Sequence, residues 1–227
     1  MLMERERQEI VEYGKKMLTS GLTKGTAGNI SVYDPETGYM AISPSGVGYL
    51  DTKTEDIVIM DLNGNIIEGD RKPSSEHDLH TIVYKKKPYA KSVVHTHSMF
   101  CSTLSCLNTP LEAVHYVLAD AGVPRVPVVS YRTYGTKELA EIVGEQMGKS
   151  DAALLANHGM LACGASLQSA YGLASTCEWV AELQWRCMCV GKPSVLPDEE
   201  VKVVMEHFKS YGQNECEGEA PAHSYNG

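Results

Sequence analysis

The stretch KSVVHTH, residues 91–97, predicts the central element of the fold. Its apolar and β-branched residues predict a buried strand. Residues two apart on a strand face the same side of a sheet, so the imidazoles of His95 and His97 can point toward one ion. A lone histidine in a strand is usually a core residue, whereas this pair, together with two further stretches, predicts a metal site.

The two further stretches supply the remaining candidate ligands. PSSEHDLH, residues 73–80, contains Glu76, and LLANHG, residues 154–159, contains His158. Three imidazole nitrogens and one carboxylate form a ligand set suited to zinc, in which the carboxylate is the ligand that leaves most easily. A metal site that can open for a substrate is a catalytic site, so the pattern predicts an enzyme.

Spacing alone does not choose the fourth ligand. Ser75 and Asp78 match a capping box for a helix over 74–87, which would place Glu76 in the first turn. His80 lies four residues after Glu76 on the same face of that helix and competes with it as a ligand. The other candidates are His77 and His115.

Hydrophobic patterns predict interleaved helices and strands along the chain. Expected helices cover 4–22, 74–87, 100–107, 111–121, 137–148, 166–191 and 198–211; expected strands cover 30–33, 39–43, 57–61, 66–68, 91–97, 126–130, 152–156 and 160–163. Hairpin signals such as Asn63-Gly64 favour a mixed or largely antiparallel sheet with helices on both faces. We expect one domain over 1–212 and a polar, disordered tail over 213–227.

Composition argues against several classes of function. The formal net charge is −9 and the basic residues form no dense run beyond residues 85–87, so no nucleic-acid partner is expected. The sequence contains no apolar run of about 18 residues, so no membrane span is expected. The seven scattered cysteines lack the paired spacing of zinc sites and favour a reduced, cytoplasmic setting.

Three loops of small residues form a second candidate site. They are GTAGN at 25–29, SPSG at 43–46, and Ser74-Ser75 at the start of an expected helix. Glycine lets backbone amides approach an anion, and a helix N-terminus favours negative charge. Each loop alone is more commonly an ordinary turn, but Ser74 and Ser75 directly precede a candidate metal ligand. We therefore expect a small phosphorylated substrate whose anion binds near the metal ion.

Longer motifs extend these local patterns over nearly the whole chain. In order, they are GTAGNIS, ISPSG, KPSSEHDLH, VVHTHS, AVHY, YGTKEL, LLANHG and FKSYG. Together they resemble the class II aldolase family, which includes L-fuculose-1-phosphate aldolase and L-ribulose-5-phosphate 4-epimerase. The resemblance runs from about residue 4 to residue 212 and is strongest to the bacterial fuculose-phosphate aldolases.

This resemblance implies a fold, an assembly and a set of site residues. The fold is a three-layer α/β/α arrangement with a central, mainly antiparallel sheet, and the assembly is a homotetramer with active sites between subunits. The implied zinc ligands are Glu76, His95, His97 and His158. The implied phosphate-binding residues are Asn29, Ser45, Gly46, Ser74 and Ser75, with Thr26 and Gly28 shaping the loop. Tyr116 and Tyr211 match catalytic tyrosines that the family supplies from a neighbouring subunit, although composition alone favours a core tyrosine at position 116.

The implied activity is zinc-dependent cleavage of a ketose 1-phosphate. L-Fuculose 1-phosphate, a substrate of fucose metabolism, is the leading expectation, with dihydroxyacetone phosphate and L-lactaldehyde as products. Alternatives are an aldolase for 5-deoxyribulose 1-phosphate or its methylthio analogue, and the 4-epimerase branch, in which aspartate holds the position of Glu76. A non-catalytic module like the adducin head ranks last, because its members lack the metal ligands present here.

The resemblance also places an apolar wall against the methyl group of the aldehyde. Phe208 matches one aromatic residue of that wall, whereas Tyr134 stands where fuculose-phosphate aldolase has phenylalanine. The additional hydroxyl would suit a more polar or different aldehyde, so the identity of the aldehyde stays open.

Overall fold

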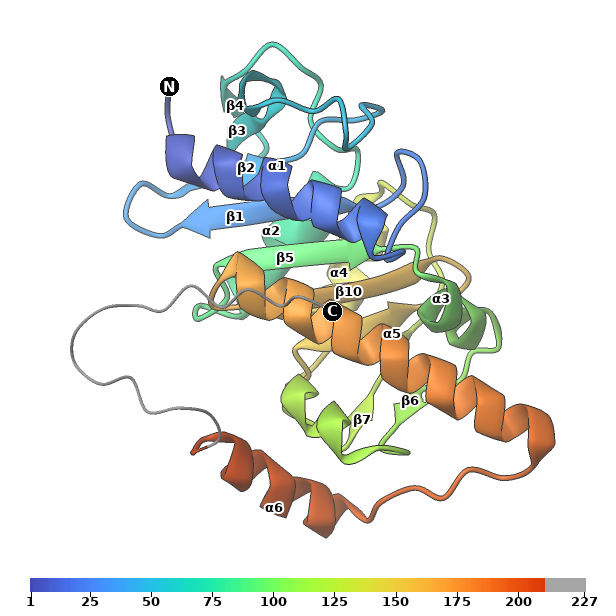
Figure 1. The fold of residues 1–227 in the computed structure, drawn as a ribbon. Helices are drawn as coiled ribbons and strands as arrows, with labels where there is room; N and C mark the ends of the chain where they lie inside the picture. Colours follow the sequence, from blue (N-terminus) through green and yellow to red (C-terminus); the bar gives the residue numbers. More distant parts are fainter. Residues whose placement is uncertain (211–227) are drawn as a thin grey trace.

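The computed structural model describes residues 1–210, and an eight-stranded sheet forms its centre (Figure 1). The strand order is β4-β3-β2-β1-β5-β10-β9-β8, and all neighbours are antiparallel except β8 and β9. The strands are β1 Asn29–Asp34, β2 Tyr39–Ile42, β3 Val58–Asp61, β4 Ile66–Glu68, β5 Ser92–Thr96, β8 Val128–Val129, β9 Ala152–Leu155 and β10 Gly159–Gly164. The expected, mainly antiparallel sheet is therefore confirmed.

Helices on both faces complete three layers (Figure 1). The first face carries α1 (Glu4–Thr19), α3 (Met99–Cys106) and α5 (Leu167–Val190), and the second carries α2 (His77–Lys86) and α4 (Lys137–Gln146). Alternation along the strands separates two hydrophobic cores. On β5, for example, Val94 packs with the first set of helices, whereas Val93 packs with α2 and α4.

β5 lies in the interior of the sheet between β1 and β10. His95 pairs with Asn29 on β1 and with Leu161 on β10. Because His95 is two residues after Val93, its side chain faces the layer that contains α2. The topology thereby directs the histidine toward the N-terminus of α2, which Glu76 precedes.

The expected helix over 111–121 is wrong. Leu111–Glu112 forms β6, which pairs with β7 (Arg125–Val126) in a separate two-stranded sheet, and only Tyr116–Ala121 is helical, as the 3-10 helix η2. The imidazole of His115 caps this helix by accepting a hydrogen bond from a backbone N–H two residues on. Strand pairing and side-chain capping therefore override the apolar periodicity of the segment.

The expected strand over 126–130 is divided at Pro127. The residues before it pair with β6, whereas those after it pair with β9 in the large sheet. Proline has no backbone N–H to donate to a strand ladder, and the Pro127 carbonyl accepts a hydrogen bond from Leu154. One expected strand thus becomes two short ones.

The expected capping box of Ser75 and Asp78 is also wrong. α2 begins at His77, Glu76 occupies the N-cap position, and no side chain caps the helix. The backbone N–H of Glu76 donates to Ser74 Oγ at 3.3 Å. The Glu76 carboxylate consequently takes no part in capping its own helix.

The end of the chain limits two further expectations. α6 (Asp198–Phe208) ends three residues before the predicted end at residue 211. Tyr211 and the expected disordered tail over 213–227 lie outside the described residues. Among the helices within residues 1–210, none is both long and apolar enough to span a membrane.

Candidate metal centre

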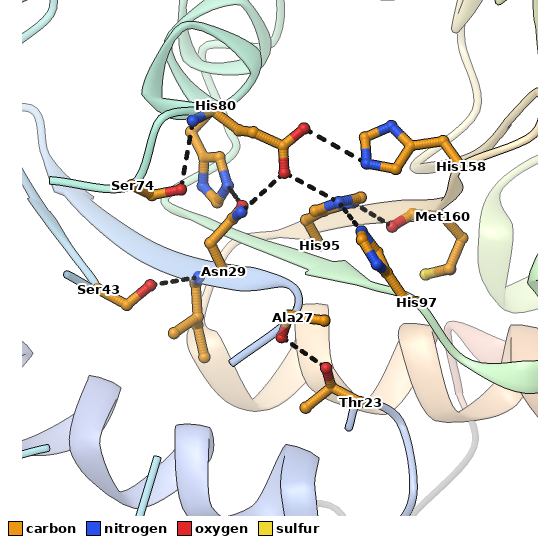
Figure 2. Close-up of polar contacts among 12 residues, drawn as sticks. Thr23, Ala27, Asn29, Ser43, Ser74, His80, His95, His97, His158 and Met160 are labelled. Atoms are coloured by element: carbon orange, nitrogen blue, oxygen red, sulfur yellow. Dashed lines mark hydrogen bonds and ion pairs between the residues drawn. The ribbon is translucent and has the colours of Figure 1, made fainter. Parts of the chain in front are cut away.

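Glu76, His95, His97 and His158 converge at one point beside the N-terminus of α2. One potential ligand atom from each lies within 4.8 Å of all the others. The three imidazole rings meet edge to face, with ring centroids 4.8 Å to 4.9 Å apart (Figure 2). The structure therefore brings together four side chains from three distant stretches of the sequence.

The turn that carries His158 fits tightly against β5. Asn157 adopts a left-handed conformation with φ of 54°, and β10 begins at Gly159. A Cβ atom at Gly159 would lie 2.3 Å from the carbonyl oxygen of Thr96, so a side chain there would force the two segments apart. Glycine thus permits the approach that sets His158 beside His95 of β5 and beside His97, which follows that strand.

The orientation of His95 is fixed from the side opposite the cluster. Its Nδ1 lies 2.9 Å from the carbonyl oxygen of Met160 (Figure 2). A carbonyl oxygen only accepts, so Nδ1 carries the proton and the lone pair of Nε2 points into the cluster. A metal-binding imidazole needs this tautomer and this fixed ring.

Glu76 completes the cluster from the N-cap of α2. Its Oε2 lies 3.2 Å from His95 Nε2 and accepts a hydrogen bond from Asn29 Nδ2 at 3.0 Å, and its Oε1 lies 3.4 Å from His158 Nε2. The residue is only 6% exposed, and Oε1 has no hydrogen-bond partner among the described residues. Leaving a buried carboxylate oxygen unpaired is costly, and a bound cation would remove that cost.

Burial and neighbouring charges set the protonation of the cluster. Burial, followed by repulsion from His95, lowers the pKa of His97 and of His158 to about 4. Burial alone would raise the pKa of the Glu76 carboxyl, but its close contacts with His95 and His158 and a hydrogen bond from Asn29 hold it well below its usual range. Near neutral pH, His97 and His158 are therefore neutral and Glu76 is ionised, as cation binding requires.

Three separations between candidate ligand atoms lie near those expected around a small tetrahedral cation. Four ligands about 2.0–2.1 Å from an ion lie about 3.3 Å from one another. The measured separations are 3.0 Å between His95 Nε2 and His97 Nε2, 3.2 Å between His95 Nε2 and Glu76 Oε2, and 3.4 Å between His158 Nε2 and Glu76 Oε1. The cluster can therefore hold a divalent metal ion.

The competing histidines lie outside this cluster. His80 is fully buried, and its two ring nitrogens contact Asn29 and Ser31. His115 packs against Trp179 on α5. The four grouped side chains include neither of these, nor His77. The structure thus favours Glu76 as the fourth ligand, a choice that spacing had left open.

The three small-residue loops meet beside the cluster (Figure 2). Backbone hydrogen bonds join the loop at Ser43 to the loop at Ser74, and the backbone N–H of Ile30 donates to Ser43 Oγ at 3.2 Å. Ser43 therefore connects all three loops, a role that sequence reasoning missed although the SPSG motif contained it. Of the candidate phosphate-binding residues, Asn29 and Ser74 are buried, Gly28 is partly buried, and Thr26, Ser45, Gly46 and Ser75 are exposed.

The first of these loops touches β5 directly. A Cβ atom at Gly28 would lie 2.6 Å from the carbonyl oxygen of His95, so only glycine fits there. The hydroxyl of Thr23 donates to the carbonyl of Ala27 at 2.5 Å and holds the loop in place (Figure 2). The loop that bears Thr26 is therefore anchored against the strand of the metal centre.

Composition alone favours a core position for Tyr116, but its side chain does not lie in the interior. Its side chain is 53% exposed on η2, and its ring neighbours are His115 and Phe208. Figure 1 shows α6, which carries Phe208, at the lower edge of the molecule, away from β1 and α2. The structure therefore does not bring Tyr116 or Phe208 to the metal centre of their own chain.

Tyr134, the other aldehyde-pocket candidate, lies in a different region. It is 67% exposed in the loop between β8 and α4. The next residue, Gly135, lies close to Ser75: a Cβ atom at Gly135 would be 3.2 Å from the carbonyl oxygen of Ser75. Tyr134 is thus near Ser75, in the third of the small-residue loops, and the structure does not place it with Phe208.

Comparison with known proteins agrees with this geometry. Residues 8–185 match the family described as Class II Aldolase and Adducin N-terminal domain. A 5-deoxy-D-ribulose 1-phosphate aldolase of Bacillus thuringiensis serovar kurstaki is 47% identical over 94% of this chain and 100% of its own. An L-fuculose phosphate aldolase of Escherichia coli is 39% identical over 92% of this chain and 98% of its own. A solved L-fuculose 1-phosphate aldolase superposes with a TM-score of 0.89 and 44% identity, covering 92% of this chain and 98% of that one. This chain belongs to the class II aldolase and adducin family.

Proposed function

We propose that this chain is a zinc-dependent aldolase that cleaves a ketose 1-phosphate between C3 and C4, producing dihydroxyacetone phosphate and a short aldehyde. The observation that carries the proposal is the cluster of Glu76, His95, His97 and His158 beside three loops suited to an anion. Family membership supports the lyase reaction. The donor set of three imidazoles and one carboxylate supports zinc as the ion.

Each group of residues has one task in this reaction. When bound, zinc would supply a Lewis acid that stabilises negative charge on the substrate oxygens. The phosphate would be held by Asn29, Ser45, Gly46, Ser74 and Ser75, in a loop shaped by Thr26 and Gly28. Positioning by these contacts would set the C3–C4 bond near the cluster and lower the entropic cost of reaction.

Two side chains would move the protons of the reaction. Tyr116 of a neighbouring subunit would take the proton of the C4 hydroxyl, whose oxygen becomes the aldehyde oxygen as the C3–C4 bond breaks. The bonding electrons pass to C3. Glu76, ionised at rest, would take up a proton from solvent and deliver it to C3, while Tyr116 would release the proton of the C4 hydroxyl to solvent, so the two transfers balance. Glu76 suits this task because its Oε1 is buried without a hydrogen-bond partner among the described residues.

The alternatives within the family are less well supported. In the 4-epimerase branch an aspartate holds the position of Glu76, and the longer side chain here suits both ligation and proton transfer. A non-catalytic module like the adducin head lacks the ligands, whereas this chain places all four within 4.8 Å. Zinc analysis of the purified protein separates enzyme from module, because only the enzyme would carry about one ion per chain.

The relatives change the order in which substrates are tested. The sequence motifs favour L-fuculose 1-phosphate, but the 47% identical relative is a 5-deoxy-D-ribulose 1-phosphate aldolase, and the fuculose aldolase of Escherichia coli is 39% identical. Both compounds are ketose 1-phosphates that end in a methyl group. We therefore propose a methyl-terminated ketose 1-phosphate as the substrate class, with 5-deoxyribulose 1-phosphate first, followed by L-fuculose 1-phosphate and the methylthio analogue.

A substrate panel tests this function. We expect the highest kcat/KM for 5-deoxyribulose 1-phosphate, measured by coupled detection of dihydroxyacetone phosphate. The matched control is the same ketose without phosphate. Losing two or more charge-assisted hydrogen bonds, at about 1.5–3 kcal/mol each, should lower its kcat/KM by at least about 100-fold. Equal turnover of both forms would contradict the anion site, and 4-epimerisation without aldehyde release would favour the epimerase.

We further propose that the assembly is a homotetramer whose active sites are shared between chains. Tyr116 and Phe208 line an open groove of about 610 Å³ between η2 and α6, away from the cluster of their own chain. In a closed ring, rotational symmetry can bring this groove over a neighbour's metal centre. Tyr211, which follows α6, would then act as part of a lid over the aldehyde.

Subunit complementation tests the shared site. Tyr116→Phe should retain zinc and lose most turnover, because only the proton acceptor at C4 is removed. Mixing this variant with the Glu76→Gln variant under subunit exchange should restore activity, since some sites of the hybrid ring keep both residues. If exchange is verified and activity stays absent, each site is built from one chain.

A further inference from the structure

A line of buried hydrogen bonds leads from Glu76 into the core. Asn29 Nδ2 lies 3.0 Å from Glu76 Oε2, and Asn29 Oδ1 lies 2.5 Å from His80 Nε2 (Figure 2). His80 Nδ1 lies 2.6 Å from Ser31 Oγ, which lies 2.6 Å from the hydroxyl oxygen of Tyr84. The line therefore joins residues of β1 and α2 to the carboxylate of the metal centre.

The ionised carboxylate at one end fixes the direction of every bond. An ionised carboxylate only accepts, so Asn29 must present its amide nitrogen to Glu76 and its oxygen to His80. His80 must then donate from Nε2, which leaves Nδ1 as an acceptor for the hydroxyl of Ser31. Ser31 in turn accepts from Tyr84. All donors thus point toward Glu76. Only the His80 tautomer with its proton on Nε2 fits this set of hydrogen bonds.

The surroundings keep this line rigid and free of water. His80 and Ser31 are 0% exposed, and Asn29 and Tyr84 are each 4% exposed. Burial lowers the pKa of His80 to about 3, so the ring is neutral and keeps one donor and one acceptor. A group removed from the line would leave a buried partner without a replacement from solvent.

We propose that His80 is a positioning residue, which holds the Asn29 amide so that it binds Oε2 of Glu76 and leaves Oε1 for the metal ion or a proton. The inference rests on the proposed function of Glu76. Without the donor at Nε2, Asn29 could rotate its amide, and a rotated amide would present its oxygen to the carboxylate. Glu76 would then lose its fixed partner, and of the proposed phosphate-binding residues only Asn29 would change its side-chain contacts.

The matched pair His80→Met and His80→Gln tests this role. The two side chains have similar length and volume, but only glutamine keeps an N–H donor for Asn29. We expect His80→Met to lower kcat by about 10- to 100-fold and to weaken zinc binding, measured by competition with a chelator, by about tenfold. The KM for the ketose phosphate should rise by less than kcat falls, because Asn29 is the one proposed phosphate contact that would change. His80→Gln should recover most of both losses.

Two further variants show whether the effect follows the line of hydrogen bonds. Ser31→Ala deletes the donor to Nδ1, removes one oxygen only, and should lower kcat in the same direction by about three- to tenfold. Tyr84→Phe removes the most distant hydroxyl and should leave kcat within about twofold of the unsubstituted protein, because Ser31 still donates to His80. Ser31→Ala serves as the main test if His80→Met does not fold.

The outcomes separate this inference from the proposed function. Equal losses in His80→Met and His80→Gln, or wild-type kcat and zinc affinity in a folded His80→Met or Ser31→Ala, would overturn the positioning role. An unsubstituted protein that cleaves no ketose phosphate would instead refute the aldolase assignment. In that event the zinc competition experiment would still report whether His80 orients Glu76.

Discussion

His97→Ala should lose its bound zinc and reduce aldol cleavage by on the order of a thousandfold or more, because several kcal/mol of charge stabilisation would disappear with the metal ion. His97 is the most informative of the three histidines because it is partly exposed, whereas His95 is fully buried and its removal would also leave a cavity. His95→Ala and His158→Ala should show the same loss of metal. Zinc per chain and kcat/KM should therefore be measured on all three, together with thermal unfolding.

The matched control is His77→Ala, which removes the imidazole next in sequence to Glu76, outside the cluster. It should keep about one zinc ion per chain and most of the activity. His80→Ala should also bind about one zinc ion per chain, although more weakly, as in His80→Met, because its ring nitrogens contact Asn29 and Ser31 and supply no ligand atom. Stoichiometric zinc and normal activity in any of the three alanine variants of the cluster would remove that residue from the ligand set.

Glu76→Gln should lower kcat by about 10²- to 10⁴-fold, the range typical of a lost general acid or base. The amide keeps the shape of the side chain and an oxygen near the metal ion, so much of the zinc should remain. It cannot carry the proton that the reaction delivers to C3. Because substrate contacts elsewhere are intact, KM should change much less than kcat.

An exposed glutamate on another helix provides the control for this variant. Glu138→Gln, in the first turn of α4, removes the same charge without touching the site and should leave kcat unchanged. Wild-type activity in Glu76→Gln would refute its role in proton transfer. Complete loss of zinc in Glu76→Gln would instead mean that the carboxylate acts mainly as a ligand.

Local sequence patterns predict most strands of the large sheet and the common orientation of His95 and His97, although β5 ends at Thr96 and not at His97 as expected. Alternation of side chains along a strand is a strictly local rule, so two histidines two residues apart must face the same side. The turn at Asn157-His158-Gly159 is also predicted from sequence. The structure agrees, since Asn157 adopts a left-handed conformation and a Cβ at Gly159 would collide with Thr96. These features depend on the backbone within a few residues.

Features that depend on distant contacts are predicted poorly. The segment 111–121 has helical periodicity, but its first residues pair with Arg125–Val126, which local propensity cannot register. The sequence places Glu76 in the first turn of a helix, but it does not show that the Glu76 carboxylate contacts Asn29, His95 and His158. His80 fitted the spacing of a ligand, and only the fold shows that it faces Asn29 and Ser31 instead.

Zinc titration of chelator-stripped protein tests most directly whether the Glu76–histidine cluster is the catalytic centre of an aldolase. Release of dihydroxyacetone phosphate from 5-deoxyribulose 1-phosphate would be followed as zinc is added to the stripped protein. Activity should begin near zero, rise linearly, and level off at about one zinc ion per chain, and the His97→Ala protein should stay inactive throughout. Full turnover by stripped protein, or equal recovery by His97→Ala, would contradict a metal-dependent reaction at this cluster.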